Sequence, residues 1–193
     1  GVEDFRLKGL GYYDAGSRSF YTNDKPIETP SDLSGLKIRV LNSPTAVATV
    51  RALGGAATPV AWGELYTALQ QGVVDGAENN PPSYYLSRHY EIARYYSLDE
   101  HTSVPDVMLA SLPVWESLNE QQRTWLTKAM EDSVEYQREL WKTSTQASLE
   151  KVKAEGVTVI TPDKAPFVEA VKPFHKSFEN TPIGDLITQI KAM

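Results

Sequence analysis

An arginine and an asparagine forty positions apart, Arg39 and Asn79, are the residues of this chain best placed to bind a ligand. Each ends a strand-like run, and around Arg39 apolar residues alternate with charged ones, as in a half-buried strand. That run stops at Ser43 and Pro44, the first a good helix cap and the second suited to the first helical position. The pattern therefore predicts a guanidinium beside the N-terminus of a helix.

A planar cation and free backbone N–H groups together favour a bound carboxylate. We therefore expect this region to capture a small organic acid. The alternative is that Arg39 is only a surface charge, which is common for a single arginine at a strand end.

Trp62 and Glu78 also fall at or just after expected strand ends. Ligands of open α/β sheets bind beyond the carboxyl ends of the strands, so we expect these residues to share one crevice with Arg39 and Asn79. Glu78 and Asp106 carry carboxyl groups that suit either ligand hydroxyls or a general acid and base pair. Both uses stay open.

The order of expected elements predicts an α/β fold with a parallel-rich sheet, because strand-helix-strand repeats give parallel strands. The repeats comprise strands 36–40, 57–60 and 73–78 and helices 44–53 and 63–71. The other expected elements are strands 7–13 and 19–22 around a turn, a helix over 84–96 and a strand over 104–111.

The segment 119–155 contains neither Gly nor Pro, begins with Asn119 and Gln122 at capping-box spacing and ends before Gly156. It is expected to form one helix of about 36 residues, roughly 54 Å long. Such a helix either braces two lobes or joins a partner's coiled coil, and its single apolar stripe without sustained heptads favours bracing. A short strand over 157–160 and helices over 165–174 and 184–191 are expected to follow.

The composition is that of a globular protein, with 41% hydrophobic and 23% charged residues among 193. No apolar run approaches the ~20 residues of a membrane span. The formal net charge of −6 and the lack of a Lys/Arg-rich block argue against nucleic-acid binding. The chain has no cysteine, which excludes disulfides, thiolate metal sites and cysteine nucleophiles.

The sequence lacks the common motifs of cofactor and hydrolytic chemistry. It has no P-loop, and Gly9 and Gly11 lack the third glycine and the following helix of a dinucleotide fingerprint. Its three histidines are scattered, and no Gly-x-Ser-x-Gly elbow is present. We therefore expect no cofactor, no metal and no catalytic residues.

Three segments carry a resemblance to a known family: DLSGLKIRV from Asp32, AWGELYTALQ from Ala61 and VDGAEN from Val74. In these segments the chain resembles the periplasmic solute-binding proteins of tripartite ATP-independent periplasmic (TRAP) transporters, the DctP-like family. The match runs from about Leu7 to the C-terminus. It implies a periplasmic-binding-protein-like fold of two lobes with a long bracing helix.

The resemblance also implies roles for the site residues. The arginine matching Arg39 makes the main salt bridge to the ligand carboxylate, and the asparagine matching Asn79 hydrogen-bonds the ligand. Arg18 is expected to supply a second cation. Trp62 is expected to pack on the ligand.

Four more residues are implied around the pocket. Asn42 and His101 are expected to lie near it, and Glu78 and Asp106 are candidates for binding ligand hydroxyls. For His101 the alternative is a histidine satisfied by neighbouring backbone groups.

Members of the family begin with a strand-helix-strand stretch that this sequence lacks, so the first lobe is expected to be incomplete. We expect 1–34 to form part of that lobe and a crossing segment, and 35–103 to form the second lobe. The remaining ranges are 104–118, a crossing strand and short helix; 119–155, the inter-lobe helix; and 156–193, the C-terminal strand and helices.

The resemblance implies a periplasmic protein that binds a small organic acid without chemistry and delivers it to the permease subunits of a TRAP transporter. Its contact with the membrane is expected to be peripheral, through that permease. The residues after Asn79 look most like members that bind sugar acids such as glucuronate and galacturonate; a C4-dicarboxylate or 2-oxo acid is the alternative ligand. The rival classes are a sugar-acid enzyme using Glu78 and Asp106, and a sensor that signals through the long helix.

Overall fold

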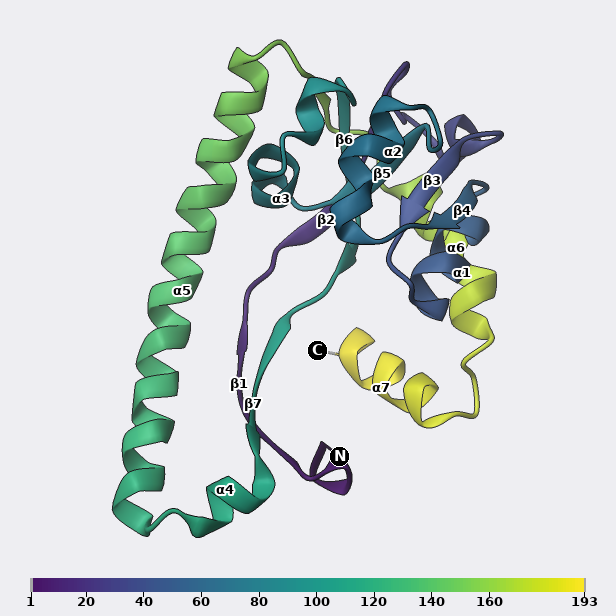
Figure 1. The fold of residues 1–193 in the computed structure, drawn as a ribbon. Helices are drawn as coiled ribbons and strands as arrows, with labels where there is room; N and C mark the ends of the chain where they lie inside the picture. The colour runs from purple at the N-terminus through teal and green to yellow at the C-terminus, as the bar shows by residue number, and fades with distance from the viewer. Residues whose placement is uncertain (1, 193) are drawn as a thin grey trace.

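The computed structural model describes residues 2–192 and arranges their strands as a six-stranded mixed sheet and a separate two-stranded ribbon (Figure 1). The order in the sheet is β4 (Ala56–Pro59), β3 (Lys37–Val40), β5 (Gly76–Asn79), β2 (Ser17–Thr22), β6 (Tyr95–Ser103) and β8 (Thr158–Ile160). β3 runs parallel to β4 and β5, and β6 to β8, whereas β2 is antiparallel to both its neighbours. The ribbon pairs β1 (Leu7–Tyr13) with β7 (Asp106–Ser111) in antiparallel fashion.

This arrangement confirms the α/β class and the parallel pairing predicted for the two strand-helix-strand units. The six-stranded sheet takes β2 from the range 1–34 and β8 from the range 156–193. The division into lobes by residue range stays a prediction.

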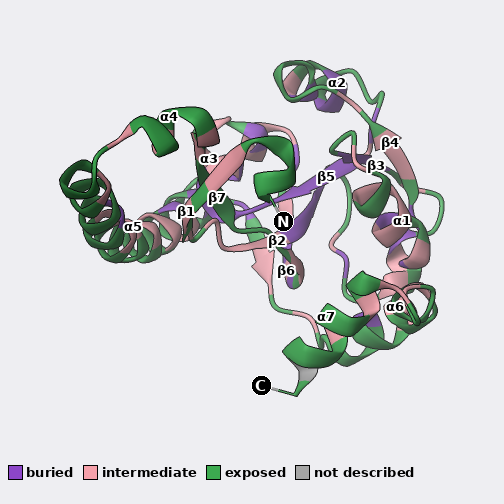
Figure 2. Cartoon of the chain, turned by 90° about the horizontal axis from the view of Figure 1, so that it is seen from below, coloured by how far each residue is buried: buried purple, intermediate pink, exposed green. Residues whose placement is uncertain are grey.

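Helices cover both faces of the sheet, because successive strand residues point to opposite sides. On one face Phe20 packs with residues of α1 (Pro44–Ala52) and α6 (Ala165–Lys176). On the other face the next residue, Tyr21, packs with α2 (Leu65–Gln70), α3 (Pro81–Leu86) and the C-terminal part of α5 (Glu120–Ala154). Figure 2 shows that the most buried strands, β2 and β5, lie between these layers.

Shorter elements connect these layers. They are the 3₁₀ turns η1 (Val2–Phe5), η2 (Pro30–Leu33), η3 (Trp62–Glu64) and η4 (His89–Glu91) and the helices α4 (Leu112–Ser117) and α7 (Pro182–Lys191). None of the helices within residues 2–192 is both long and apolar enough to cross a bilayer.

The predicted long helix is confirmed as α5, with a complete capping box between Asn119 and Gln122 at its start. Its N-terminal half lies along the ribbon, and its C-terminal half reaches α3 (Figure 1). Gly11 of β1 leaves room for Met130, and Lys151 lies 5.0 Å from the centre of the Tyr85 ring. The helix therefore contacts both the ribbon and the sheet domain, as expected for a brace.

The helix predicted over 84–96 is wrong. α3 begins earlier, at Pro81, and ends at Leu86; Arg88 then adopts a left-handed conformation (φ 59°), and β6 starts at Tyr95. The tyrosines that suggested one helical face instead come from separate elements, since Tyr84 and Tyr96 meet in the core with ring centroids 4.6 Å apart. Tertiary packing therefore overrides the local pattern here.

Candidate functional site

Arg39 is a buried cation that has no anionic partner. Arg39 lies on β3 and is only 1% exposed to solvent. Its Nε donates to the carbonyl oxygen of Val60 at 2.8 Å. Its Nη1 is buried without an acceptor, and no carboxylate of residues 2–192 lies within ion-pair distance. Burial lowers the pKa of this guanidinium, and the charge of Arg18 lowers it further. A buried charge without a partner is costly, so this position is suited to receive an anion.

Trp62 lies directly beside this cation. The Cζ atom of Arg39 is 5.5 Å from the centroid of the indole ring, a cation–π distance. The residue starts η3, just after β4, and remains 42% exposed. An aromatic face is thus held at the edge of the sheet next to the buried guanidinium.

Strand pairing sets which face of the sheet each residue uses. Arg39 is in register with Ala77 of β5, so both side chains point to the same face. Asn79, two residues further on, shares that face, whereas Glu78 points to the opposite one. The residues predicted to share one crevice therefore lie on both faces of the sheet, and a single crevice that includes Arg39, Asn79 and Glu78 stays a prediction.

Arg18 joins these two faces at the strand ends. Its Nε and Nη2 donate to the two oxygens of the Glu78 carboxylate at 2.5 and 2.8 Å, and its Nη1 donates to Oδ1 of Asn79 at 2.9 Å. Its charge is thus paired with Glu78, and its role as a second cation for the ligand stays a prediction. Oδ1 of Asn79 also accepts from the N–H of Asn80, so the amide Nδ2 is left as the group for donation to a ligand.

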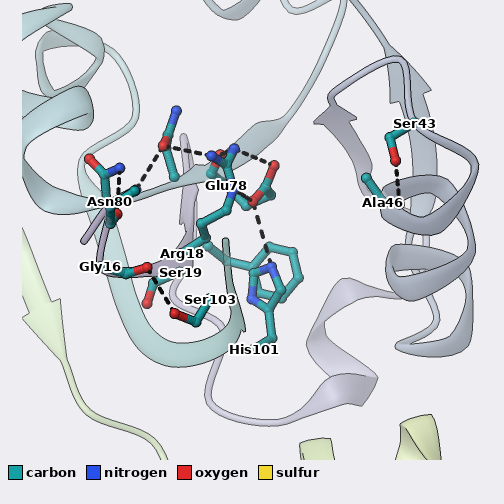
Figure 3. A network of polar contacts seen from close by, with 12 residues as sticks. Gly16, Arg18, Ser19, Ser43, Ala46, Glu78, Asn80, His101 and Ser103 are labelled. Carbon is teal, nitrogen blue, oxygen red and sulfur yellow. Dashed lines mark hydrogen bonds and ion pairs between the residues drawn. The ribbon is translucent and has the colours of Figure 1, made fainter. Parts of the chain in front are cut away.

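His101 lies between two carboxylates. Its Nδ1 is 2.7 Å from Asp99, and its ring stacks on Phe20 at 4.2 Å. Its Nε2 is 3.7 Å from Glu78 (Figure 3). Burial lowers the pKa of His101, but the hydrogen bond to Asp99 and the nearby negative charge of Glu78 outweigh it and raise the pKa to about 9. The imidazole is therefore charged at neutral pH. Its partners are carboxylates and not the backbone groups of the alternative reading.

A groove of about 170 Å³ separates this network from the first turn of α1. Arg18, Glu78 and His101 line one side, and Ser43 and Ala46 line the other (Figure 3). The Ser43 side chain accepts from the Ala46 N–H at 3.4 Å, which confirms the predicted helix cap. The helix N-terminus and the charged network thus face one another across the groove.

Two predicted residues lie apart from these contacts. Asn42 follows β3 and is exposed. Asp106 is exposed on β7 of the ribbon, where it pairs in register with Tyr13. Their contact with a ligand stays a prediction.

Sequence reasoning missed Asp99 and His89. Asp99 and His101 flank Glu100, which has a left-handed backbone (φ 50°), and the pairing of β6 with β2 is irregular between residues 97 and 102. Simple strand alternation therefore does not predict that the two side chains meet, and the helix predicted over 84–96 placed this region in a connection. His89 had no local signal in the sequence, because its neighbours come from three other elements. They are Tyr21 of β2, Trp62 of η3 and the charged Arg39 of β3.

A buried cation, an amide and an exposed aromatic ring lie at the strand ends of this α/β domain. Residues 2–181 match the family described as bacterial extracellular solute-binding protein, family 7 (DctP). The chain therefore belongs to this family of extracellular solute-binding proteins.

Relatives of known sequence and structure agree with this assignment. A solute-binding protein from Chromohalobacter salexigens is 42% identical over 185 residues, covering 94% of this chain and 55% of the relative. A TRAP periplasmic solute-binding protein from Xanthobacter autotrophicus, solved with bound β-D-galacturonate, superposes with a TM-score of 0.92 at 46% identity. A similar protein from C. salexigens with bound D-glucuronate gives a TM-score of 0.95 at 41% identity.

This chain is shorter than the proteins that it matches. It spans about half the length of the curated relatives and 64% of the two solved chains, while 99% of its own residues are covered by each of them.

Proposed function

We propose that this chain is the larger part of a periplasmic solute-binding protein that captures a hexuronate, such as galacturonate or glucuronate, for a TRAP-type transporter. The observation that carries the proposal is the buried guanidinium of Arg39, which has an unpartnered Nη1 and no carboxylate within reach. The ligand carboxylate supplies the missing anion. Arginine suits this role because its planar fork matches the two oxygens of a carboxylate.

The neighbouring groups fit the rest of a sugar acid. The amide Nδ2 of Asn79 points away from its own hydrogen-bonded Oδ1 and donates to a ligand oxygen. The exposed indole of Trp62 covers a C–H face of the sugar ring. The first turn of α1 adds positive potential on the far side of the groove.

The charges of the site favour one ligand carboxylate over two. Arg18, Arg39 and the protonated His101 carry three positive charges, and Glu78 and Asp99 carry two negative ones. The balance of these five side chains is 3 − 2, or one positive charge. A hexuronate carries one negative charge and neutralises it, whereas a C4-dicarboxylate leaves an excess negative charge. The relatives solved with galacturonate and glucuronate support the same ligand class.

The site supports binding without turnover. A general acid must carry a proton to give, but the positive charge of His101 and the hydrogen bonds of Arg18 outweigh burial and hold the pKa of Glu78 below its usual value. Asp106, the other carboxylate of the enzyme alternative, lies on the ribbon. Delivery to permease subunits follows from the family assignment and is part of this proposal.

A thermal-shift and calorimetry series on the full-length protein tests the ligand. Galacturonate and glucuronate are compared with galactose, which lacks the carboxylate, and with succinate and pyruvate. Ligand at one hundred times its dissociation constant stabilises the folded state by ~2.7 kcal/mol. We expect a shift with the hexuronates and none with galactose. A shift with succinate or pyruvate alone refutes the hexuronate assignment, and an equal shift with galactose refutes the role of the carboxylate.

A further inference from the structure

His89 packs against the indole of Trp62 from inside the protein. The two rings meet edge to face, with centroids 5.1 Å apart and planes at 67°. His89 comes from η4 and is 2% exposed, whereas Trp62 comes from η3 and projects from the surface. The ring contacts of Trp62 within residues 2–192 are this one and the contact with Arg39.

The hydroxyl of Tyr21 holds His89 in turn. The Tyr21 oxygen lies 2.9 Å from Nδ1 of His89, and the two rings stack with centroids 5.7 Å apart. Tyr21 itself is fully buried on β2 and packs against Tyr84 at 4.7 Å and Tyr96 at 6.1 Å. A continuous set of ring contacts therefore runs from the fixed centre of the core to the exposed indole.

We propose that His89 is a positioning residue for the ligand site, which fixes the angle of the Trp62 indole beside the Arg39 guanidinium. An exposed tryptophan on a three-residue turn samples several rotamers unless a neighbour restricts it, and ordering it at the moment of binding weakens binding. With His89 behind it, the indole is preordered to cover the C–H face of the sugar acid. This inference rests on the proposed function.

The surroundings of His89 agree with a structural role in its neutral form. Burial lowers the pKa of His89 to about 4, and the nearby charge of Arg39 contributes to the same shift. The titratable or charged groups that face it are the Tyr21 hydroxyl and the Arg39 guanidinium. A neutral ring supports the indole without adding a second cation next to Arg39.

A double-mutant cycle on the full-length protein tests the inference. Affinity for galacturonate is measured by calorimetry in Trp62→Ala, His89→Ala and the double variant. We expect His89→Ala to weaken binding about three- to tenfold, the size of one aromatic contact. If His89 acts through Trp62, the double variant binds no more weakly than Trp62→Ala. The inference is overturned if the losses of affinity in the two single variants multiply in the double variant. It is also overturned if His89→Ala leaves the affinity unchanged.

Milder variants guard against a loss of folding. Tyr21→Phe removes only the hydroxyl that orients His89, and His89→Phe keeps an aromatic ring behind the indole. Tyr21→Phe is expected to weaken binding through Trp62, while His89→Phe is expected to restore most of the affinity lost in His89→Ala. The matched control is Tyr13→Phe, because the Tyr13 hydroxyl of β1 lies 2.9 Å from Oγ of Ser133 on α5 and does not contact η3 or η4.

A ligand-free measurement separates this inference from the proposed function. The fluorescence of Trp62 is isolated by subtracting the spectrum of the same protein carrying Trp62→Phe. His89→Ala is expected to increase the quenching of this signal by acrylamide, and Tyr13→Phe to leave it unchanged. If the unmodified protein does not bind galacturonate, the proposed function fails, but unchanged quenching in His89→Ala is what refutes the positioning role.

Discussion

Arg39 and Glu78 stand near the ends of neighbouring parallel strands and point to opposite faces of the sheet, because Arg39 is in register with Ala77. On one face the buried guanidinium lies beside Trp62. On the other, Glu78 is paired with Arg18 and faces the groove at α1. The strands themselves thus keep the unpaired charge of Arg39 apart from the paired charge of Glu78.

Replacing Arg39 removes the cationic partner of the proposed ligand carboxylate. Truncating one member of a buried charge pair typically costs 2–5 kcal/mol, so Arg39→Ala is expected to weaken galacturonate binding at least about thirtyfold by calorimetry. Arg39→Lys keeps the charge but loses the two-pronged geometry. Its affinity for galacturonate should therefore fall between those of the unmodified protein and Arg39→Ala. Arg51→Ala is the control, since Arg51 is exposed in the last turn of α1 and does not line the groove. Equal affinity in Arg39→Ala and Arg51→Ala contradicts the prediction.

Glu78→Gln changes the charge of the site without much change in shape. It leaves Arg18 without its carboxylate and raises the balance of the described charges from +1 to +2. Galacturonate and galactarate, which carry one and two carboxylates on similar polyol chains, measure the effect. We expect the ratio of their affinities to shift about tenfold toward galactarate, from Coulomb energies at an effective dielectric constant of about 20. An unchanged ratio shows that the network does not set ligand charge.

The raised pKa of His101 predicts that the folded state loses stability in mild alkali. Its folded-state pKa is raised from 6.5 to about 9 by Asp99 and Glu78. The stabilisation is therefore complete below about pH 6.5 and is lost as the pH rises through about 9. Urea unfolding of the unmodified protein should weaken over this window, and that of His101→Gln should weaken less. Parallel curves for the two proteins contradict the prediction.

The depressed pKa of His89 acts in a different window, which keeps the two histidines separable. Because its folded-state pKa lies near 4, below the ordinary 6.5, stability is lost as the pH falls from about 6.5 toward 4. His89→Phe should reduce that acid loss and leave the alkaline change intact.

Gly16 is expected to tolerate no side chain. Its φ is +65°, and an added Cβ lies 2.8 Å from Nε1 of Trp141 on α5. Gly16→Ala should lower the free energy of unfolding by about 1–3 kcal/mol, from left-handed strain and overlap. Gly63→Ala is the control, since nothing lies within 4 Å of its added Cβ. Similar urea midpoints for the two variants rule out this role for Gly16.

Local patterns were enough to predict the elements that carry strong periodicity or clear punctuation. Helix α5 follows from its capping box and its lack of Gly and Pro, and the position of Arg39 at the end of β3 follows from strict alternation before Ser43. The segment from 84 to 103 was misread, because its tyrosines suit a helix and a strand equally well and its turn depends on the backbone conformation of Arg88. Only packing against Tyr21 and Val152 distinguishes the two.

The ligand contacts of the predicted site residues stay a prediction, and the pairings among those residues could not be predicted from the sequence. Arg18, Glu78, Asn79 and His101 do contact one another, yet nothing in their spacing shows that Glu78 is shared by Arg18 and His101. That sharing depends on β2 lying between β5 and β6, which is a long-range fact of topology.

The length of α5 has a consequence for how this chain tolerates insertions. Gln137 exchanges two hydrogen bonds with the backbone of Asp14, and Lys151, about four turns later, lies over the Tyr85 ring. One residue inserted between these contacts rotates everything beyond it by about 100°, and four restore the face but shift it by about 6 Å. Either way one contact or the other is lost. The two contacts therefore fix the number of helical residues between Gln137 and Lys151, and this segment of α5 should tolerate insertions poorly.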